Sequence, residues 1–376
     1  MRHKSVPSDE NVQRCGAQPH VEEKLNPANI STPKNILVIR LSAMGDVAMT
    51  VPVIRAALEQ HPDINLTVLT RQAFVPLFHG LNVQFVIPDL KGKHKGLGGL
   101  FVLFRELQGY ADWDAIIDLH DVLRSKIIRT LFRIKGIPTH HIDKGRKEKK
   151  QLTAKSNKVS HQLKHTTSRY ADVFEKAGLS LDLSVVDPAK NTFQTSSEAS
   201  LVLGEGAAKH IGIAPFAQHA QKMYPLKKMQ AVIEALDNQG YKLYIFGGGQ
   251  EEKQQAEILC QNTRHTTNLI GKYPLTDELG LLSNMDVIIT MDSANMHMAA
   301  LAGTPVLSVW GATHPFAGFG PFGQDKQDRF IQIPTDELPC RPCSVFGNKP
   351  CHRGDFACMN SITPDEIVKR VEAVLA

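Results

Sequence analysis

The sequence predicts an α/β protein made of two doubly wound parallel sheets that face each other across a cleft. Apolar runs typical of buried strands alternate with helical segments in two separate series along the chain. A polar stretch with little apolar periodicity separates the series, and 376 residues suffice for two cores of common domain size. We therefore expect an N-terminal extension at 1–33, a first domain at 34–180, a linker region at 181–208 and a second domain at 209–376.

Each series is predicted to form parallel strands joined by right-handed helical crossovers. In the first series we expect strands near 35–41, 65–70, 83–87 and 114–119, and helices near 46–60, 72–79, 98–109, 121–134 and 165–177. In the second we expect strands at 210–215, 241–246, 286–290 and 305–310, and helices at 226–238, 251–260, 293–301 and 363–375.

The most informative turn follows the first predicted strand. Ligands of open parallel sheets bind at the carboxyl ends of the strands, so Ser42, Met44, Gly45 and Asp46 are expected to line a crevice. A carboxylate at this point is where an α/β enzyme would hold a catalytic base. The alternative is that Asp46 only caps the following helix, because Asp is favoured near helix starts.

A second turn of interest joins the strand at 286–290 to the next helix. Asp292 and Ser293 precede that helix, whose unpaired N–H groups and dipole suit a diphosphate. His297 lies one turn further along the same face, where it could touch a phosphate or a ribose. An N-capping Asp and a structural His are the alternative.

Two other segments could serve the same ligand. Gly247, Gly248 and Gly249 follow a strand and would let a nucleotide approach closely, although many such turns carry glycine for backbone reasons. Lys222 could reach a leaving diphosphate as a cation in place of magnesium, or it could simply be exposed to solvent. No Gly-x-Gly-x-x-Gly fingerprint with a later acid is present, which disfavours a nicotinamide dehydrogenase.

The net charge of +5 is concentrated in one polar segment. This basic segment is either a solvated loop or a mobile flap that attracts an anionic glycolipid or an anionic membrane surface. Nucleic acid is disfavoured, because no aromatic residues alternate with the cations. No apolar run is long enough for a membrane span, and 1–33 lacks an apolar signal core, so we expect a cytoplasmic protein with peripheral contact at the inner membrane. The cations of the segment are Lys144, Arg146, Lys147, Lys149, Lys150, Lys155, Lys158 and Lys164.

Four of the six cysteines cluster in a loop rich in Pro and Gly, at 340–358. A C-x2-C pair followed by two further cysteines can hold structural zinc, but the second pair lacks the usual short spacing. Free thiols or a labile disulfide are the alternatives, and no partner that would activate a catalytic cysteine is apparent. The candidate zinc ligands are Cys340, Cys343, Cys351 and Cys358, whereas Cys15 and Cys260 stand alone.

These stretches together resemble glycosyltransferase family 9, the ADP-heptose:lipopolysaccharide heptosyltransferases, over roughly residues 35–375. The matching segments are 39–47, 118–125, 222–225, 291–297 and 303–313, and the cysteine loop is similar to one found in part of the family.

The resemblance implies a GT-B fold, with the acceptor bound by the first domain and the nucleotide sugar by the second. It implies an inverting transfer in which Asp46 deprotonates an acceptor hydroxyl, with no metal needed for catalysis. The acceptor would be the anionic inner core of lipopolysaccharide, and we expect a monomer. The implied nucleotide-sugar residues are Lys222, Asp292, Ser293, Ala294, His297, Gly247, Gly248 and Gln218, and the acceptor residues are Ser42, Met44, Gly45 and Arg124.

The chain departs from the family pattern at two places. Ser293-Ala294 stands where many members carry Thr-Gly, and Ala217-Gln218 where some carry paired Thr. Ala294 lacks the backbone freedom of glycine, which leaves the donor sugar open. The competing hypotheses are a GT-B transferase that uses another nucleotide sugar and a non-catalytic nucleotide-sugar-binding protein.

Overall fold

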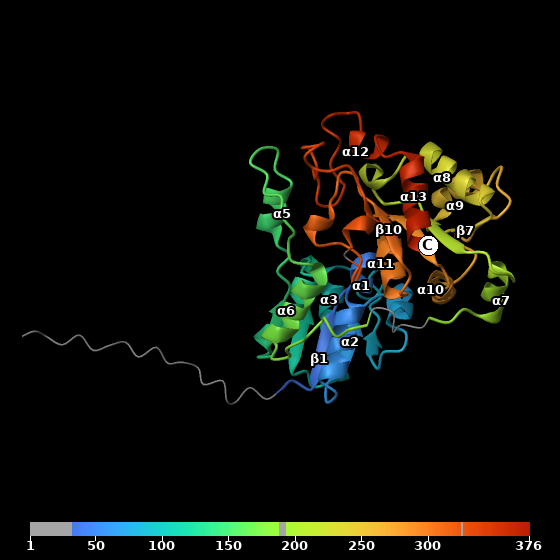
Figure 1. The fold of residues 1–376 in the computed structure, drawn as a ribbon. Helices are drawn as coiled ribbons and strands as arrows, with labels where there is room; N and C mark the ends of the chain where they lie inside the picture. Colours follow the sequence, from blue (N-terminus) through green and yellow to red (C-terminus); the bar gives the residue numbers. More distant parts are fainter. Residues whose placement is uncertain (1–31, 188–192, 325) are drawn as a thin grey trace, which may run out of the picture. The chain divides into compact units, whose positions relative to one another are not determined.

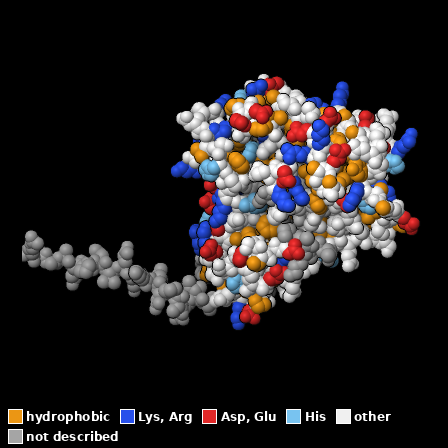
Figure 2. Space-filling view, viewed as in Figure 1, with side chains coloured by type: hydrophobic (Ala, Val, Ile, Leu, Met, Phe, Trp, Pro, Cys, Tyr) orange, Lys and Arg blue, Asp and Glu red, His pale blue; other side chains and the backbone are white. Residues whose placement is uncertain are grey.

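The computed structural model describes residues 32–187, 193–324 and 326–376, and residues 33–376 form one compact unit (Figure 1). The expectations for Cys15 and for nearly all of the N-terminal extension lie outside the described residues. No helix in the described ranges is long and apolar enough to cross a membrane. On the face drawn in Figure 2, hydrophobic side chains occur in small groups between charged ones.

The first sheet is wholly parallel and carries the first lobe of the molecule. Its strand order is β3-β2-β1-β4-β5. The chain thus adds β2 and β3 on one side of β1 and then β4 and β5 on the other. Ile36, Leu37, Val38 and Ile39 of β1 are fully buried, because helices cover both faces of the sheet. The strands are β1 (Asn35–Ile39), β2 (Asn65–Leu69), β3 (Gln84–Val86), β4 (Ala115–Asp118) and β5 (Thr139–His141). The helices are α1 (Met44–Ala48), α2 (Val51–Gln60), the 3₁₀ helix η2 (Gln72–Phe78), α3 (Gly96–Tyr110), α4 (Leu123–Ile134), α5 (Arg146–Leu152) and α6 (Thr166–Lys176).

The second sheet, also parallel, has the order β11-β10-β9-β6-β7-β8 and carries the second lobe. The strands are β6 (His210–Ala214), β7 (Lys242–Ile245), β8 (Thr266–Asn268), β9 (Val287–Met291), β10 (Val306–Val309) and β11 (Phe330–Ile331). The helices are α7 (Ser197–Ser200), η4 (Leu201–Leu203), η5 (Ala220–Lys222), α8 (Leu226–Asn238), α9 (Gln250–Leu259), α10 (Leu275–Ser283), α11 (Ala294–Leu301), η6 (Pro315–Ala317), η7 (Gln327–Arg329), α12 (Ala357–Asn360) and α13 (Pro364–Leu375).

The two lobes meet at α1 and α11. One cluster of buried apolar side chains includes Val47 of α1 and Met296 of α11, so part of the core is shared between the lobes. In Figure 1, α1 (blue) and α11 (orange) lie next to each other at the junction of the lobes. This junction places the turn before α1 opposite the start of α11.

The predicted alternation of strands and helices is confirmed, with differences in several elements. The single helix expected at 46–60 is wrong, because α1 ends at Ala48 and α2 begins at Val51. Pro52 lies in the first turn of α2, where its missing N–H costs little. In the interior of a longer helix the same proline would remove a hydrogen bond, so α1 and α2 are separate helices. The segment at 72–79 is a 3₁₀ helix with Pro76 inside it. The strands β5, β8 and β11 and the helices α5 and α10 were not predicted from the sequence, nor were the short helices α7, α12, η4, η5, η6 and η7.

Residues 196–203 of the predicted linker region pack on the second lobe, whereas Asp182 exchanges two hydrogen bonds with Gln60 of the first lobe. The side chain of Asp277 on α10 accepts hydrogen bonds from the backbone N–H of Ser196 (2.7 Å) and from its hydroxyl (3.1 Å). The Tyr244 hydroxyl of β7 donates to the carbonyl of Leu203 (3.2 Å). These contacts fix α7 and η4 against the second sheet.

Candidate active site

Asp46 lies where two cavities between the lobes meet. It belongs to the first turn of α1, and its Oδ2 accepts a hydrogen bond from the N–H of Ala43 (3.3 Å) and pairs with the Arg40 guanidinium (2.7 Å). One cavity has a volume of about 1420 Å³ and the other of about 1680 Å³. Asp46 lines both, as do Phe319 and Phe346 of the second lobe. The first lobe thus presents one carboxylate to both cavities.

The smaller of these, which we call the basic cavity, is walled by long cationic side chains. Asp46 is the only acid among the described residues that line it. A cavity of this charge attracts anionic groups, because its cations face a confined space. Its Lys and Arg residues are Arg40, Lys144, Arg146, Lys149, Lys150, Arg169 and Lys349.

Four of these cations come from the basic segment, which we expected to be a solvated loop or a mobile flap. The structure instead places the helix α5 there and buries Lys149, whose Nζ lies 4.1 Å from the ring centroid of Phe319. Burial lowers the pKa of Lys149 to about 8, and the charge of Arg169 adds to this effect. Lys158 and Lys164 do not line the basic cavity.

Lys158 and the chain that follows it tie the first lobe to the second. The Lys158 Nζ lies 2.9–3.1 Å from four successive carbonyl oxygens, those of residues 339–342, which share the three N–H groups of the ammonium. The N–H of Leu163 donates to the carbonyl of Phe316 (2.9 Å), and the N–H of Thr166 to the carbonyl of Gly318 (2.9 Å). These bonds hold α5 next to the second lobe, so both lobes enclose the basic cavity.

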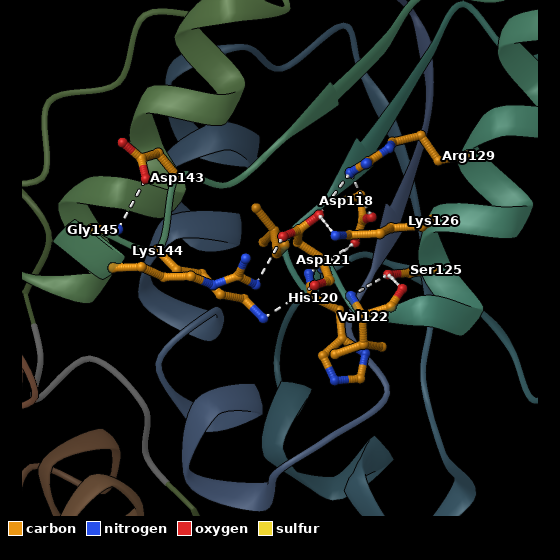
Figure 3. Close-up of polar contacts among 12 residues, drawn as sticks. Asp118, His120, Asp121, Val122, Ser125, Lys126, Arg129, Asp143, Lys144 and Gly145 are labelled. Atoms are coloured by element: carbon orange, nitrogen blue, oxygen red, sulfur yellow. Dashed lines mark hydrogen bonds and ion pairs between the residues drawn. The ribbon is translucent and has the colours of Figure 1, made fainter. Parts of the chain in front are cut away.

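A buried polar network at the end of β4 positions the cations on the other wall of this cavity (Figure 3). Asp118 has no solvent exposure, accepts the N–H groups of His120 (2.9 Å) and Asp121 (2.8 Å), and pairs with Arg129 (3.0 Å). Asp121 pairs in turn with Arg146 (3.4 Å), while its carbonyl accepts a hydrogen bond from Lys144 Nζ (3.2 Å). The motif at 118–125 therefore supports the wall of the cavity.

His120 lines the basic cavity as a neutral group. Burial lowers its pKa to about 3, and the charges of Arg40 and Lys144 act in the same direction. Its Nε2 lies 3.3 Å from the hydroxyl of Ser42. Its Nδ1 is buried and has no hydrogen-bond partner in the part of the chain that the structure describes. The imidazole thus brings no charge to the cavity.

The larger cavity, which we call the glycine-rich cavity, follows the carboxyl edge of the second sheet. Turns after β6, β7 and β9 meet there, because these strands are neighbours and parallel. All eight residues predicted for the nucleotide sugar line this one cavity, together with Met44 and Gly45 of the first lobe. Ser42 lines the basic cavity instead. Arg124 is exposed at the start of α4 and lines neither cavity.

The start of α11 forms the wall of this cavity nearest Asp46. Ser293 is the N-cap of α11, and Asp292 before it pairs with Lys222 Nζ at 2.8 Å. Burial lowers the pKa of His297 to about 4, so this imidazole is neutral at pH 7. Free N–H groups of the helix and an adjacent ammonium group are the two features that bind a diphosphate.

The lobes approach each other closely at Gly45. A Cβ atom at this position would lie 2.8 Å from His297 Cδ2 and 3.2 Å from the Cα of Ala294. Only glycine allows α1 to contact α11 at this distance. Gly45 therefore sets the gap between Asp46 and the start of α11.

The four clustered cysteines line a separate small cavity of about 340 Å³. Within residues 32–187, 193–324 and 326–376, no set of three or more His, Cys, Asp or Glu side chains is arranged to hold a metal ion. Burial raises the pKa of Cys358 to about 11, so its thiol is protonated at neutral pH.

Several residues of the two cavities were not predicted as site residues. Arg40, His120, Arg169 and Glu278 reach the cavities from different elements, and only Arg40 lies beside the predicted turn in the sequence. The Lys and Arg content of α5 was the only sequence signal for the basic wall.

Comparison with known proteins relates this architecture to one family. The family model described as glycosyltransferase family 9 (heptosyltransferase) matches residues 100–344. The chain is 27% identical over 366 residues to lipooligosaccharide heptosyltransferase 2 of Haemophilus influenzae, covering 91% of this chain and 99% of that protein.

Solved structures share the fold. The crystal structure of a family 9 glycosyltransferase from Veillonella parvula superposes with a TM-score of 0.69 at 19% identity, covering 93% of this chain and 99% of that one. The E. coli heptosyltransferase WaaC with ADP-2-deoxy-2-fluoro heptose gives a TM-score of 0.61 at 18% identity, covering 90% and 99%. The family model matches across both lobes, and the two lobes are parallel sheets with a cleft between them. The chain therefore belongs to glycosyltransferase family 9 and is a glycosyltransferase with a GT-B fold.

Proposed function

We propose that the chain transfers a heptose from an ADP-sugar to the anionic inner core of lipopolysaccharide, with inversion at the anomeric carbon. The observation that carries this proposal is the position of Asp46 on the wall of both cavities. A base there can contact an acceptor hydroxyl in one cavity and face a donor sugar in the other. The names of the Haemophilus and E. coli relatives support an ADP-linked heptose as the donor and a lipooligosaccharide as the class of acceptor.

In the proposed reaction the donor occupies the glycine-rich cavity. Its diphosphate binds the N–H groups at the start of α11 and the ammonium of Lys222, which exchanges its pairing with Asp292 for the phosphate. Asp46 takes the proton of the acceptor hydroxyl as the oxygen forms its bond to the anomeric carbon. The bond from that carbon to the diphosphate breaks, and ADP leaves with the electron pair while Lys222 and the helix N–H groups stabilise its charge.

The acceptor occupies the basic cavity. Lys149, Arg169 and the cations held by Asp121 face this space from α5, α6 and the β5–α5 turn. Carboxylates and phosphates of an inner-core oligosaccharide would be held there by several charge-assisted hydrogen bonds. Arg40 pairs with Asp46 and so orients the carboxylate between the two substrates.

The substitution Asp46→Asn tests the base. We expect kcat to fall by about 10²–10⁴-fold, because the amide cannot accept the proton. Thermal stabilisation by ADP should be unchanged, since the diphosphate site is intact. The control is Asp112→Asn, which removes an exposed carboxylate outside both cavities. Turnover at the wild-type rate in Asp46→Asn would refute the role of Asp46.

A panel of nucleotide sugars with a truncated lipopolysaccharide acceptor separates the proposed donor from the alternatives. Turnover of ADP-heptose supports the proposal, and turnover of a different nucleotide sugar alone identifies another GT-B transferase. Binding of ADP without turnover of any donor would identify a non-catalytic binding protein.

Three expectations remain predictions. Structural zinc on the four cysteines is tested by the metal content of the purified protein. The monomeric state is tested by light scattering, and the cytoplasmic location with peripheral contact at the inner membrane by cell fractionation.

A further inference from the structure

Glu278 is a carboxyl group inside the glycine-rich cavity for which the proposed chemistry has no use. It lies on α10, between β8 and β9, and lines the cavity together with Gly271, which follows β8. Its side chain makes no hydrogen bond or ion pair with any residue in the described ranges of the chain. The neighbouring Asp277, in contrast, accepts two hydrogen bonds from Ser196. Glu278 thus faces a ligand space without a partner of its own.

The order of the strands shows which part of a donor would reach Glu278. The second sheet runs β9-β6-β7-β8, and the cavity is lined in that order by Ser293, Lys222, the glycines at 247–249 and Gly271. The reacting sugar must lie at the β9 end beside Asp46, with the diphosphate against α11 and Lys222. The nucleoside therefore extends toward β7 and β8, where α10 begins.

This end of the cavity has the shape and chemistry of a nucleobase site. Gly247 and Gly248 contribute no side chains, and an added Cβ at Gly247 would lie 2.8 Å from Ile270 Cδ1 and 3.1 Å from Phe216 Cδ2. Phe216 and Met298 also line the cavity and give it apolar surface for a flat ring. A small-molecule site of this kind is mostly apolar and takes its specificity from a few polar groups. Glu278 supplies such a group.

We propose that Glu278 hydrogen-bonds the base of the donor nucleotide and selects a 6-aminopurine. One carboxyl oxygen accepts an N–H of the exocyclic amino group, and the protonated oxygen donates to the adjacent ring nitrogen. This inference rests on the proposed function, because it takes the donor to be a nucleotide sugar bound in the glycine-rich cavity.

The protonation state fits this pairing. Burial raises the pKa of Glu278 to about 7, so the neutral acid, with one donor and one acceptor, is well populated at neutral pH. The ionised form has two acceptors and would instead suit guanine, whose edge offers two N–H donors. No charged group is among the causes of this shift. The ionisable groups on the elements around the cavity and around α10 are Glu252, His219, Lys222, Asp292, His297, Asp46, Asp277 and the exposed Glu198.

Calorimetric titration of the full chain with ADP and 1-deaza-ADP tests the proposal at pH 6.5 and pH 8.5. The two ligands share ribose, diphosphate and the amino group, and only ADP carries the ring nitrogen beside that amino group, so the ratio of their Kd values isolates the hydrogen bond donated by the protonated carboxyl. For the wild type at pH 6.5 we expect ADP to bind about tenfold more tightly, a typical effect for one or two hydrogen bonds in a site. This preference should shrink at pH 8.5 as Glu278 ionises.

Two variants and a control complete the experiment. Glu278→Leu should bind both nucleotides alike at either pH, whereas Glu278→Gln should keep the preference for ADP at both, because an amide offers a donor and an acceptor at any pH. Glu175→Gln removes an exposed carboxylate outside both cavities and should behave as the wild type.

The failures are distinguishable. If Glu278→Leu keeps the wild-type preference for ADP, the inference is overturned and the proposed function stands. If a parallel titration with GDP at pH 6.5 showed that the wild type prefers GDP to ADP and that Glu278→Leu loses this preference, the inference would also be overturned, since the carboxyl group would then read guanine. If the wild type binds no ADP or ADP-sugar at all, the proposed function itself fails.

Discussion

The two cavities that meet at Asp46 offer different kinds of groups to a charged ligand. The basic cavity uses the ends of long side chains, such as Lys149 and Arg169, which reach it from α5 and α6. The glycine-rich cavity uses backbone groups and short side chains at the ends of neighbouring strands, with Lys222 as the cation nearest α11.

The two kinds of groups should respond differently to amino-acid substitution. Backbone N–H groups at the start of α11 are fixed by the fold, so this part of the proposed diphosphate site cannot be altered without moving the helix, whereas Lys222 can be replaced by substitution. Cations on separate elements can be removed singly, and each should contribute a modest part of acceptor affinity. We expect the contacts between the lobes to matter most, because they set the distance between the two cavities.

Gly45→Ala should have the largest effect of the following variants. The new Cβ would lie 2.8 Å from His297 Cδ2, closer than real Cβ contacts, and 3.2 Å from the Cα of Ala294, so the His297 side chain must shift or α1 and α11 must move apart. We expect kcat to fall by about 100-fold, because a misplacement of about 1 Å between base and donor costs that much. The measurement is kcat with saturating substrates.

The matched control is Gly109→Ala on α3, where an added Cβ meets no atom within 4 Å. It should retain wild-type turnover. Equal activities of the two variants would show that the gap between the lobes is not set at Gly45.

Lys222→Met tests the charge of the glycine-rich cavity. We expect ADP to bind about 30-fold more weakly, the effect of one charge-assisted hydrogen bond worth about 2 kcal/mol. Acceptor KM should change little, which would separate the two cavities functionally. Lys227→Met, at an exposed position on α8, serves as the control. Unchanged ADP affinity in Lys222→Met would place the diphosphate elsewhere.

Lys149→Met tests the basic cavity and its pH dependence. At pH 7 we expect the acceptor KM to rise about tenfold, the effect of one charged hydrogen bond. For the wild type the acceptor KM should rise as the pH passes about 8, because the lowered pKa of Lys149 lets its ammonium lose a proton there. The variant should lack this rise, whereas the exposed Lys155→Met should retain it. A rise of the same size in both variants would assign the titration to another group.

Glu278→Leu should have the smallest effect when stability alone is measured. The raised pKa means that the folded chain resists ionisation of Glu278, so the wild type loses stability as the pH rises from about 4.5 to about 7. We expect the variant to raise Tm by about 2–4 °C at pH 8 and hardly at all at pH 4.5. The control Glu175→Leu, at an exposed position, should show no such pH dependence of Tm. Equal changes in Tm for Glu278→Leu and Glu175→Leu would contradict the conclusion that the Glu278 carboxyl is buried.

The glycine-rich cavity could be predicted well from the sequence, and the basic cavity only in outline. Asp292, Ser293 and Gly247 follow apolar strands directly, and parallel strands bring their carboxyl ends to one edge. Arg169 and His120 follow no such rule, because α6 and the β4–α4 turn meet α5 only in the folded chain. Arg124 shows the limit of prediction from a motif, since Asp118 in the same segment is buried while Arg124 points to solvent.

Short elements were also beyond prediction. β5 and β8 have three residues each and contain no apolar run, so they form only because a longer neighbouring strand offers its edge. Glu278 was missed for a related reason: no pattern marks a single carboxyl on α10 as facing a cavity that three other turns create.

The sequence by itself determined the alternation of buried strands and helices, and with it the two sheets and the turns at their carboxyl edges, because burial on both faces requires continuous apolar runs. The tertiary structure alone decided how closely α1 approaches α11, how α5 packs over Phe319, and which ionisable groups lose their water. Local periodicity reports which face of an element is buried. The partner across a cleft depends on contacts between residues far apart in the chain, and these exist only once both lobes have formed.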